Sequence, residues 1–159
     1  MSGQQIDLLT VLKDHPFLKG LDDDTIREMA KISTVMRFAE GERIFDEGEV
    51  HRKLYLIIYG HVALYFHIPA RGEFRFETIG SGELLGWSSL LEPFRKTSGA
   101  VAVKDTLAIA LDSEKLQRMM DRDPQLGYTL YRKIVMVVAE RLRATRIRLI
   151  DIYGGGEKL

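Results

Sequence analysis

The spacing of apolar positions changes twice along the chain, from a helical period to short alternating runs and back. Over residues 1–33, apolar side chains recur every three or four residues and so predict short amphipathic helices. Asp22 to Asp24 would lie in the first turn of the second helix, where carboxylates are favoured. The apolar positions of the two helices are Ile6, Leu9, Val11 or Leu12, and then Ile26, Met29, Ala30 and Ile32.

Residues 34–112 have the pattern of short β-strands separated by turns. Val62, Leu64 and Phe66 alternate with the residues that follow each of them, and runs of similar length recur along the segment. Many short strands with glycine at the turns predict an antiparallel barrel or sandwich, which we interpret as a compact, jelly-roll-like β-roll. The glycines stand at positions 41, 48, 60, 72, 80, 82, 86 and 99.

Helical spacing returns from residue 113. Ser113 is predicted to cap one helix at its N-terminus, and Pro124 to begin a second. No proline interrupts that second helix before Gly154, which predicts roughly 25 to 29 residues of helix where about 11 is usual. Within it, positions spaced alternately three and four residues apart form the a/d seam of a coiled coil and predict a homodimer. The seam positions are Val135, Val138, Leu142, Thr145, Leu149 and Ile152.

The three segments are short enough to share one core, because the chain has only 159 residues. We expect a mainly β domain with flanking helices, of the α+β class, over residues 1–153. The β-roll at 34–112 would lie between helices at 1–33 and at 113–153, and residues 154–159 would form a flexible tail.

Composition excludes several classes of protein. The 23 Lys and Arg residues balance the 23 Asp and Glu residues, so no overall charge favours nucleic acid or an anionic membrane. The sequence has no cysteine, no signal-peptide pattern and no apolar run of the roughly 18 residues that a membrane span needs. The expectation is a soluble, cytoplasmic protein without membrane contact.

Basic residues are concentrated in the last helix. They straddle several faces beside the seam, whereas a nucleic-acid footprint would gather them on one face, so we interpret them as solvated flanks. Only GGGEKL remains after the helix, with no helix-turn-helix, and direct DNA binding is not expected. The six residues are Arg132, Lys133, Arg141, Arg143, Arg146 and Arg148.

Five stretches in a fixed order resemble the cyclic nucleotide-binding domain family, which includes catabolite-activator-type regulators, kinase regulatory subunits and gated channels. The resemblance covers roughly residues 17–152. The stretches are HPFLKGL, FAEGERIFDEGE, KLYLIIYGHVALY, IGSGELLGWSSLL and DTLAIALDSEKLQRMM. The fourth resembles the approach to the family's phosphate-binding cassette, which would span residues 82–101 here.

The resemblance implies a particular ligand chemistry. A cyclic phosphodiester is anionic, and backbone N–H groups at a helix N-terminus hold an anion well. In the family an arginine completes the phosphate contact, and a carboxylate accepts a hydrogen bond from the ribose 2′-hydroxyl. The family pattern, Leu-Gly-Glu-x-small-apolar and then Arg-small-Ala, therefore implies these ligand-binding candidates: Gly86, Trp87, Ser88, Ser89, Leu90, Lys96, Thr97 and Ser98.

The chain departs from this pattern at the two side chains that make the family selective. Trp87 stands where the carboxylate belongs, and Lys96 stands where the arginine belongs, with Ser98 in place of alanine. Arg95 would take the arginine's place if the loop were shifted by one residue. A register that uses Gly82-Glu83 instead fits worse, because the residue before the glycine would be polar.

Trp87 has two interpretations. As an indole that packs against the roll, it would fill the vacated ribose space and close the pocket. As an exposed wall, it would stack on a base or on another flat anionic ligand. Thr145 also has two interpretations: the place of a ligand-contacting threonine in catabolite activators, or a polar seam residue that sets the helix register.

Enzymatic motifs are absent from the sequence, since it has no GxSxG and no Walker loop. His61 and His67 share a strand face without a carboxylate on that strand, which is a poor metal site. We therefore expect no catalytic residue, no metal and no certain cofactor, with cAMP or cGMP as possible ligands. The expected function is a regulatory sensor module with an unidentified downstream partner. The alternatives are a ligandless dimerisation scaffold, or a sensor of a different anionic or flat small molecule.

Overall fold

The computed structural model describes residues 7–154. It has two compact units, residues up to Arg118 and residues from Met119 on. The first unit begins with the helices α1 (Leu8–Asp14), η1 (Pro16–Leu18) and α2 (Asp23–Lys31). The Asp22 side chain accepts a hydrogen bond from Thr25 N at 2.8 Å and so begins α2. Ile26 and Met29 are buried on one side of α2, as their spacing predicts, whereas Ile6 lies outside the described residues.

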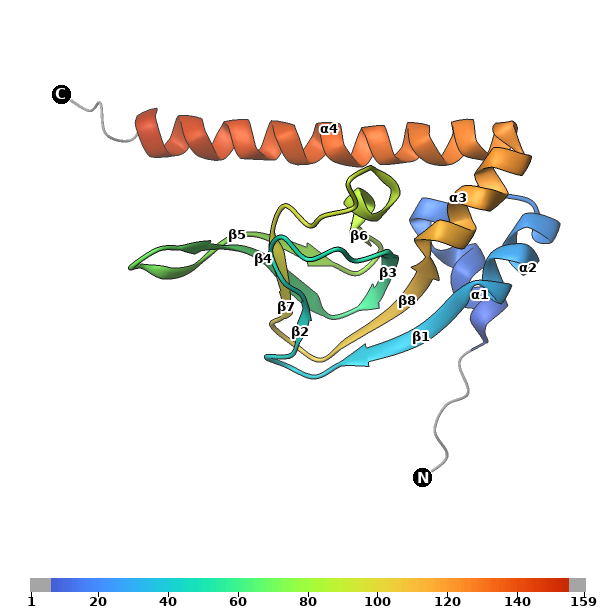
Figure 1. Cartoon of the computed structure of the whole chain (residues 1–159), viewed down its shortest axis with the longest axis horizontal. Helices are drawn as coiled ribbons and strands as arrows, with labels where there is room; N and C mark the ends of the chain where they lie inside the picture. Colours follow the sequence, from blue (N-terminus) through green and yellow to red (C-terminus); the bar gives the residue numbers. More distant parts are fainter. Residues whose placement is uncertain (1–6, 155–159) are drawn as a thin grey trace. The chain divides into compact units, whose positions relative to one another are not determined.

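Eight strands form two four-stranded antiparallel sheets (Figure 1). The first sheet has the order β1-β8-β3-β6 and the second has the order β2-β7-β4-β5. The prediction of an antiparallel β-roll flanked by helices is thus confirmed. The strands are β1 (Ser33–Phe38), β2 (Arg43–Phe45), β3 (Lys53–Tyr59), β4 (His61–Ile68), β5 (Gly72–Gly80), β6 (Leu84–Leu85), β7 (Gly99–Ala102) and β8 (Thr106–Asp112).

The core of the roll lies between the two sheets. Tyr55 and Ile57 of β3 meet Val62 and Leu64 of β4 in one buried cluster, and the two β4 residues are those that the alternating pattern predicts to be buried. Small residues complete it, because alanine side chains let the sheets approach closely. The alanines of this cluster are Ala100, Ala102, Ala108 and Ala110.

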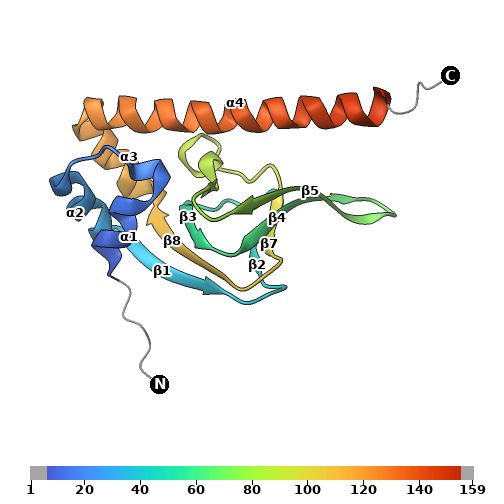
Figure 2. The ribbon, with the colours of Figure 1, turned by 180° about the vertical axis from the view of Figure 1, so that it is seen from behind.

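The outer half of the β4–β5 hairpin leaves the core. The hairpin extends away from the roll at the end opposite α1 and α2 (Figure 2). Phe66 and Phe74 are therefore exposed, although Phe66 continues the alternation of Val62 and Leu64. The pairing of β4 with β5 shifts register between Leu64 and Tyr65. Such an irregularity twists the strands and changes which face a side chain occupies.

Gly60 joins β3 to β4 at a point where no side chain fits. Its φ is +106°, and a Cβ there would lie 2.3 Å from Thr106 Oγ1. The close approach of β8 thus requires glycine at this turn.

Two helices follow the roll, α3 (Ser113–Arg122) and α4 (Pro124–Gly154). The prediction that Ser113 caps α3 is wrong: Asp112 Oδ1 accepts the hydrogen bond from Lys115 N, at 3.0 Å. Helix α4 begins at Pro124 as predicted and has 31 residues, slightly more than expected. Of the tail predicted at 154–159, all but Gly154 lies outside the described residues. Among the helices of the described part, none is long and apolar enough to cross a membrane.

Candidate functional site

The cassette begins with a tight backbone turn at Gly86. Strand β6 ends at Leu85, and the short 3-10 helix η2 (Trp87–Leu90) follows directly. Gly86 has a φ of +88°, and a Cβ there would lie 2.9 Å from Lys53 O and 3.3 Å from Lys96 Nζ. Glycine is therefore required here, because both the backbone conformation and the available space exclude a side chain.

Lys96 is the buried cation of the cassette. Its side chain reaches back to the turn, where Nζ donates to Gly86 O at 3.4 Å and to Ser88 Oγ at 3.3 Å. The same ammonium lies 4.8 Å from the centroid of the Phe45 ring. Lys96 is only 3% exposed, and this burial lowers its pKa to about 8 against a weaker, opposing effect of Glu49.

The alternative cation, Arg95, points elsewhere. Its side chain is exposed, and its guanidinium donates to Gly48 O at 3.0 Å. The isolated bridge between Val50 and Arg95 fixes this arrangement. Of the two neighbouring cations, Lys96 is the one that the structure brings to Gly86 and Ser88.

The remaining candidates of the cassette separate into three environments. Ser89, Leu90 and Ser98 are buried, whereas Thr97 is exposed. Trp87 is half-buried. The buried polar residues of the cassette are thus Ser89, Lys96 and Ser98, while the indole keeps an exposed part. Both interpretations of Trp87, and the ligand-binding role of the eight candidates, stay predictions.

Ser89 is held by a residue that the sequence did not connect with it. Its Oγ forms a hydrogen bond of 2.6 Å with Ser113 Oγ, and both side chains are fully buried. Ser113 N in turn donates to Arg52 O at 3.0 Å. The hydroxyl that was predicted to cap α3 instead joins the start of that helix to the cassette.

A loop that the sequence did not single out lies against Lys96. Backbone hydrogen bonds join Lys96 N to Glu49 O at 2.9 Å and Gly48 N to Lys96 O at 2.8 Å. These bonds bring His51 close to the cassette lysine. Only the family-like glycine hairpin FAEGERIFDEGE pointed to this region, and nothing in it distinguished Glu49 or His51.

His51 stands between two aromatic rings. Its ring stacks on Tyr55, with centroids 5.7 Å apart, and faces Phe45 at 5.4 Å. Its Nε2 lies 2.7 Å from Tyr55 Oη, and its Nδ1 lies 3.6 Å from Glu49 Oε1. Burial lowers the pKa of His51, and the charge of Lys96 lowers it further. Burial also raises the pKa of Tyr55.

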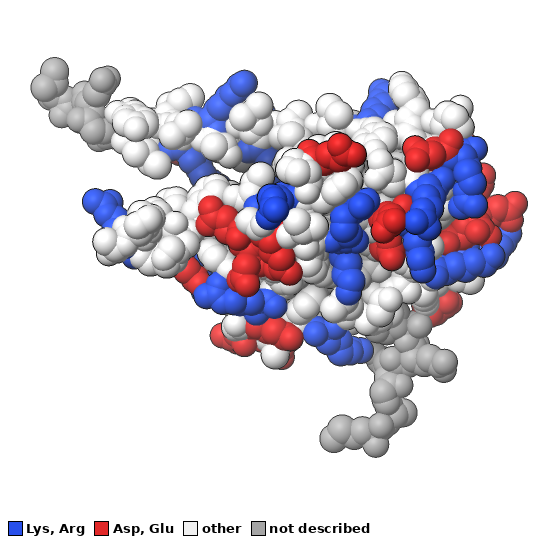
Figure 3. All heavy atoms as spheres, in the orientation of Figure 1, with Lys and Arg blue, Asp and Glu red and all other residues white. Residues whose placement is uncertain are grey.

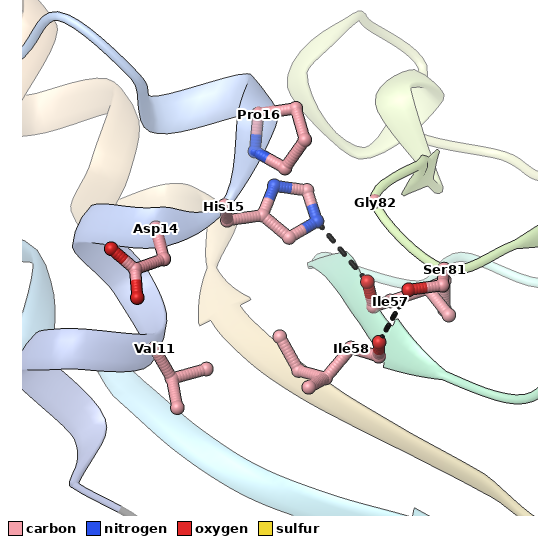
Figure 4. Close-up of a pocket in the computed structure, with 8 residues that line it drawn as sticks. All are labelled: Val11, Asp14, His15, Pro16, Ile57, Ile58, Ser81 and Gly82. Carbon is pink, nitrogen blue, oxygen red and sulfur yellow. Dashed lines mark hydrogen bonds between the residues drawn. The ribbon is translucent and has the colours of Figure 1, made fainter.

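A recess of about 280 Å³ lies beside α1 and η1, and Ser81 and Gly82 at the start of the cassette segment also line it (Figure 4). The His15 imidazole stands in its wall, where Nδ1 accepts from Phe17 N at 3.1 Å. The other ring nitrogen, Nε2, therefore carries the proton and donates to Ile57 O at 3.2 Å. Ser81 Oγ donates to Ile58 O at 2.6 Å. Because the protein satisfies these polar groups itself, the recess is a poor candidate for a ligand site.

Surface charge does not indicate another site. On the face shown in Figure 3, basic and acidic side chains intermix over the β-roll and over α1 and α2. Among residues 7–154, no group of three or more His, Asp and Glu side chains is arranged to hold a metal.

The predicted seam lies on an exposed part of α4. Five of its six positions are exposed, and Val138 is half-buried. Thr145 Oγ1 donates to Arg141 O at 2.9 Å, so its hydroxyl is satisfied by its own helix. Arg143 forms an ion pair of 2.7 Å with Glu140 along the same helix. The dimer and the ligand contact of Thr145 stay predictions.

The chain is similar in sequence to a known protein family and to two curated regulators. The family model described as cyclic nucleotide-binding domain matches residues 35–123. The CRP-like cAMP-activated global transcriptional regulator of Mycobacterium tuberculosis is 28% identical over 134 residues, which are 84% of this chain and 58% of that protein. The Cyclic AMP receptor protein of Thermus thermophilus is 29% identical over 138 residues, which are 87% of this chain and 62% of that protein. The chain thus spans about three fifths of the length of these relatives.

A solved structure has a similar extent. It comes from Geobacter metallireducens GS-15 and is described as a cyclic nucleotide-binding protein. The match has a TM-score of 0.77 at 27% identity and covers 87% of this chain and 99% of that one.

Proposed function

Since the chain belongs to the cyclic nucleotide-binding domain family, we propose that it is a non-enzymatic regulatory module that senses a small anionic ligand. In this proposal it dimerises through α4 and binds cAMP or cGMP weakly or not at all. It would act in the cytoplasm on a downstream partner yet to be identified. Because the chain spans about three fifths of its curated relatives, their activities as whole regulators are not carried over.

The position of Lys96 is the observation that carries the anion-sensing role. It stands at the family's arginine position, and its ammonium faces Gly86 O and Ser88 Oγ at the turn of the cassette. A lysine supplies charge but lacks the planar fork that grips a phosphate with two parallel hydrogen bonds. The ammonium of Lys96 can therefore attract an anion, but it cannot orient a phosphate as an arginine would.

Trp87 supports the weak selectivity for cyclic nucleotides. An indole offers no carboxylate to the ribose 2′-hydroxyl, and a buried hydroxyl without a partner costs about 1–3 kcal/mol. That cost corresponds to roughly a fivefold to 150-fold loss of affinity. The exposed part of the half-buried indole favours the alternative of a flat ligand that stacks on it.

The sole tryptophan makes the proposal directly testable, because Trp87 lies in the cassette. Its fluorescence and the melting temperature are followed while cAMP, cGMP and sulfate are added up to millimolar concentration. Saturable quenching with a rise in melting temperature supports the sensor. If no probe produces a response, the sensor is wrong and the ligandless scaffold is favoured.

A double substitution tests the assignment of the two departures. Trp87→Glu with Lys96→Arg restores the family's side chains, and cyclic nucleotide affinity should then appear or increase. The matched control is Trp87→Gln with Lys96→Arg, which has a side chain of similar size without the carboxylate charge. Equal affinity of the two double variants would show that position 87 does not receive the ribose.

The scaffold is the second candidate function, and the exposed seam on α4 favours it. Apolar side chains at Leu142, Leu149 and Ile152 stand in solvent in the single chain, which a second copy would cover. We propose no direct contact with DNA, since the basic side chains of α4 are spread over several of its faces.

A further inference from the structure

Lys96 is the one lysine or arginine side chain that is buried among residues 7–154. Its polar contacts are two neutral oxygens at 3.3 and 3.4 Å, both at the long end of the hydrogen-bond range. In this part of the chain no carboxylate oxygen lies within 4 Å of its Nζ. An ammonium group taken out of water needs a counter-charge or else tends to lose its proton. The contacts that hold Lys96 thus leave its charge incompletely compensated.

The charged and titratable groups around Lys96 do not supply that counter-charge. The charge of Glu49 acts on Lys96, but Glu49 Oε2 accepts from Asp46 N at 2.8 Å and the side chain is partly exposed. His51 is a base whose pKa the charges of Lys96 and Lys53 both lower, and Tyr55 is a neutral phenol stacked on its ring. With two bases and only one acid, which is partly exposed, these groups supply little negative charge to offset a protonated Lys96.

We propose that the cassette binds its anion together with a proton, which Lys96 holds as an ammonium group against the anion, so that affinity depends on pH as well as on ligand. The inference rests on the proposed function, because it concerns the same anion site. An anion at the turn of Gly86 and Ser88 provides the missing counter-charge and favours the protonated lysine. By linkage, a ligand that favours protonation is itself favoured by protons.

The sign of the effect follows from the pKa of about 8 for Lys96 without ligand. Below that pH the lysine already carries its proton, and binding takes up none. Above it, each binding event must take up a proton, and affinity falls by about tenfold for each further pH unit. His51 acts in the same direction at acidic pH, because protonation gives it a positive charge beside the anion.

The experiment measures the affinity for cAMP and for sulfate at about pH 7 and about pH 9, by Trp87 fluorescence and by calorimetry. Both probes keep the same charge over this range, so a change in affinity reports the protein. Calorimetry in two buffers with different heats of ionisation counts the protons taken up. For either probe that binds, we expect a dissociation constant about tenfold larger at the higher pH, with about 0.9 proton taken up per ligand there.

Three variants assign the effect to Lys96. In Lys96→Arg the side chain stays charged, so affinity should not change between the two pH values. Lys96→Met has no ammonium to face the anion and should lose sulfate binding at both pH values, which tests the role of the lysine if the arginine does not fit. Lys104→Arg, an exposed lysine on the turn before β8, should keep the wild-type pH dependence.

Two results would overturn the inference and can be told apart. If a probe binds the wild-type protein with the same affinity at both pH values and without proton uptake, the inference is wrong and the proposed function stands. If neither probe binds at either pH, the inference and the proposed function fail together.

Discussion

Ser89 of the cassette and Ser113 at the start of α3 share a buried hydrogen bond of 2.6 Å between their side-chain oxygens. Both residues are fully buried, so neither hydroxyl can turn to water if its partner is removed. The bond joins the cassette to the first turn of the helix that follows the roll.

This pair predicts a strong energetic coupling. Ser89→Ala and Ser113→Ala should each destabilise the fold by about 1–3 kcal/mol, because each leaves one buried hydroxyl unpaired. The double variant should cost less than the sum of the two, by about 1–2 kcal/mol, because it leaves no orphaned hydroxyl. Urea unfolding of the four proteins measures the coupling. Strict additivity would mean that the two hydroxyls do not depend on each other.

We expect that Lys96 lowers the stability of the unliganded protein and is needed for anion binding. Replacing it by methionine removes a buried ammonium, so the unliganded protein should become more stable at neutral pH, by about 1–3 kcal/mol, and should lose sulfate binding. In the wild type, the lowered pKa means that the unfolded chain binds more protons than the folded one between about pH 8 and the ordinary value of 10.5. Wild-type stability should therefore gain about 3 kcal/mol from this group as pH rises through that window.

Other groups titrate in the same pH window. The difference in unfolding free energy between the wild type and Lys96→Met therefore isolates the contribution of Lys96. Denaturant unfolding of wild type and Lys96→Met across the window should show the stability advantage of the variant shrinking as pH rises. Lys104→Met, which removes an exposed lysine, should follow the wild type. An advantage that stays constant with pH would mean that the folded state does not depress the pKa of Lys96.

His15 predicts a loss of stability on the acid side. Burial lowers its pKa below the ordinary value of 6.5, and the neutral ring is needed for Nδ1 to accept from Phe17 N. The stability that the neutral ring provides is complete above the unfolded pKa, and it is lost as pH falls through the folded one. His15→Asn offers an oxygen in place of Nδ1 and does not titrate, so its stability should fall less between neutral and mildly acidic pH.

The measurement compares urea midpoints at the two pH values. His67→Asn is the control, since His67 is exposed and should keep the wild-type acid sensitivity. Equal acid sensitivity of His15→Asn and wild type would assign the effect to other groups.

The sequence predicted the architecture because the roll depends on local patterns. Short alternating runs and glycines with positive φ, such as Gly60 and Gly86, identify strands and turns without knowledge of distant contacts. The same reasoning gave the wrong cap for α3, because Asp112 and Ser113 are neighbours and both residue types favour that position. The difference comes from Ser89, 24 residues earlier: its buried hydroxyl pairs with Ser113, which leaves Asp112 to cap the helix.

The site was predicted less completely, for a physical reason. Resemblance identified the cassette positions, but the burial of Lys96 depends on a loop almost fifty residues earlier in the chain. His51 and Tyr55 come beside it through the pairing of Val50 with Arg95 and through strand β3. Contacts between segments so far apart leave no periodic signal in a single sequence. The environment that sets the pKa of Lys96 is visible only in the fold.

Gly60 predicts a severe packing defect on substitution. In Gly60→Ala the new Cβ would meet Thr106 Oγ1 at 2.3 Å and Asp105 O at 2.7 Å, so β8 would have to move. We expect the free energy of unfolding to fall by more than about 3 kcal/mol, or the variant not to fold.

Gly41→Ala is the matched control: its φ of +87° carries the same kind of strain, but no atom lies within 4 Å of the added Cβ. That variant should lose only about 1–2 kcal/mol. Thermal unfolding of both variants compares them, and similar losses would mean that strain rather than the clash dominates.

The seam of α4 predicts how the chain associates. If it forms a coiled coil, the wild type should sediment at twice its mass of 18.2 kDa at micromolar concentration. Leu142→Glu with Leu149→Glu places two carboxylates on the seam of each helix and should produce a monomer, because the charges would be buried in pairs. Ile147→Glu is the matched control. Ile147 is also an exposed apolar residue of α4, but it lies two residues beyond Thr145 and so about 200° around the helix from that seam position.

The control separates a specific seam from general apolar association. A dimer that survives Ile147→Glu and is lost in the double variant requires contact through the seam itself. If all three proteins sediment as monomers, α4 does not dimerise the chain and the scaffold function loses its basis. If Ile147→Glu alone dissociates the dimer, the contact lies on another face of the helix. That face would also carry Ile150, which is three residues further along the helix and exposed in the single chain.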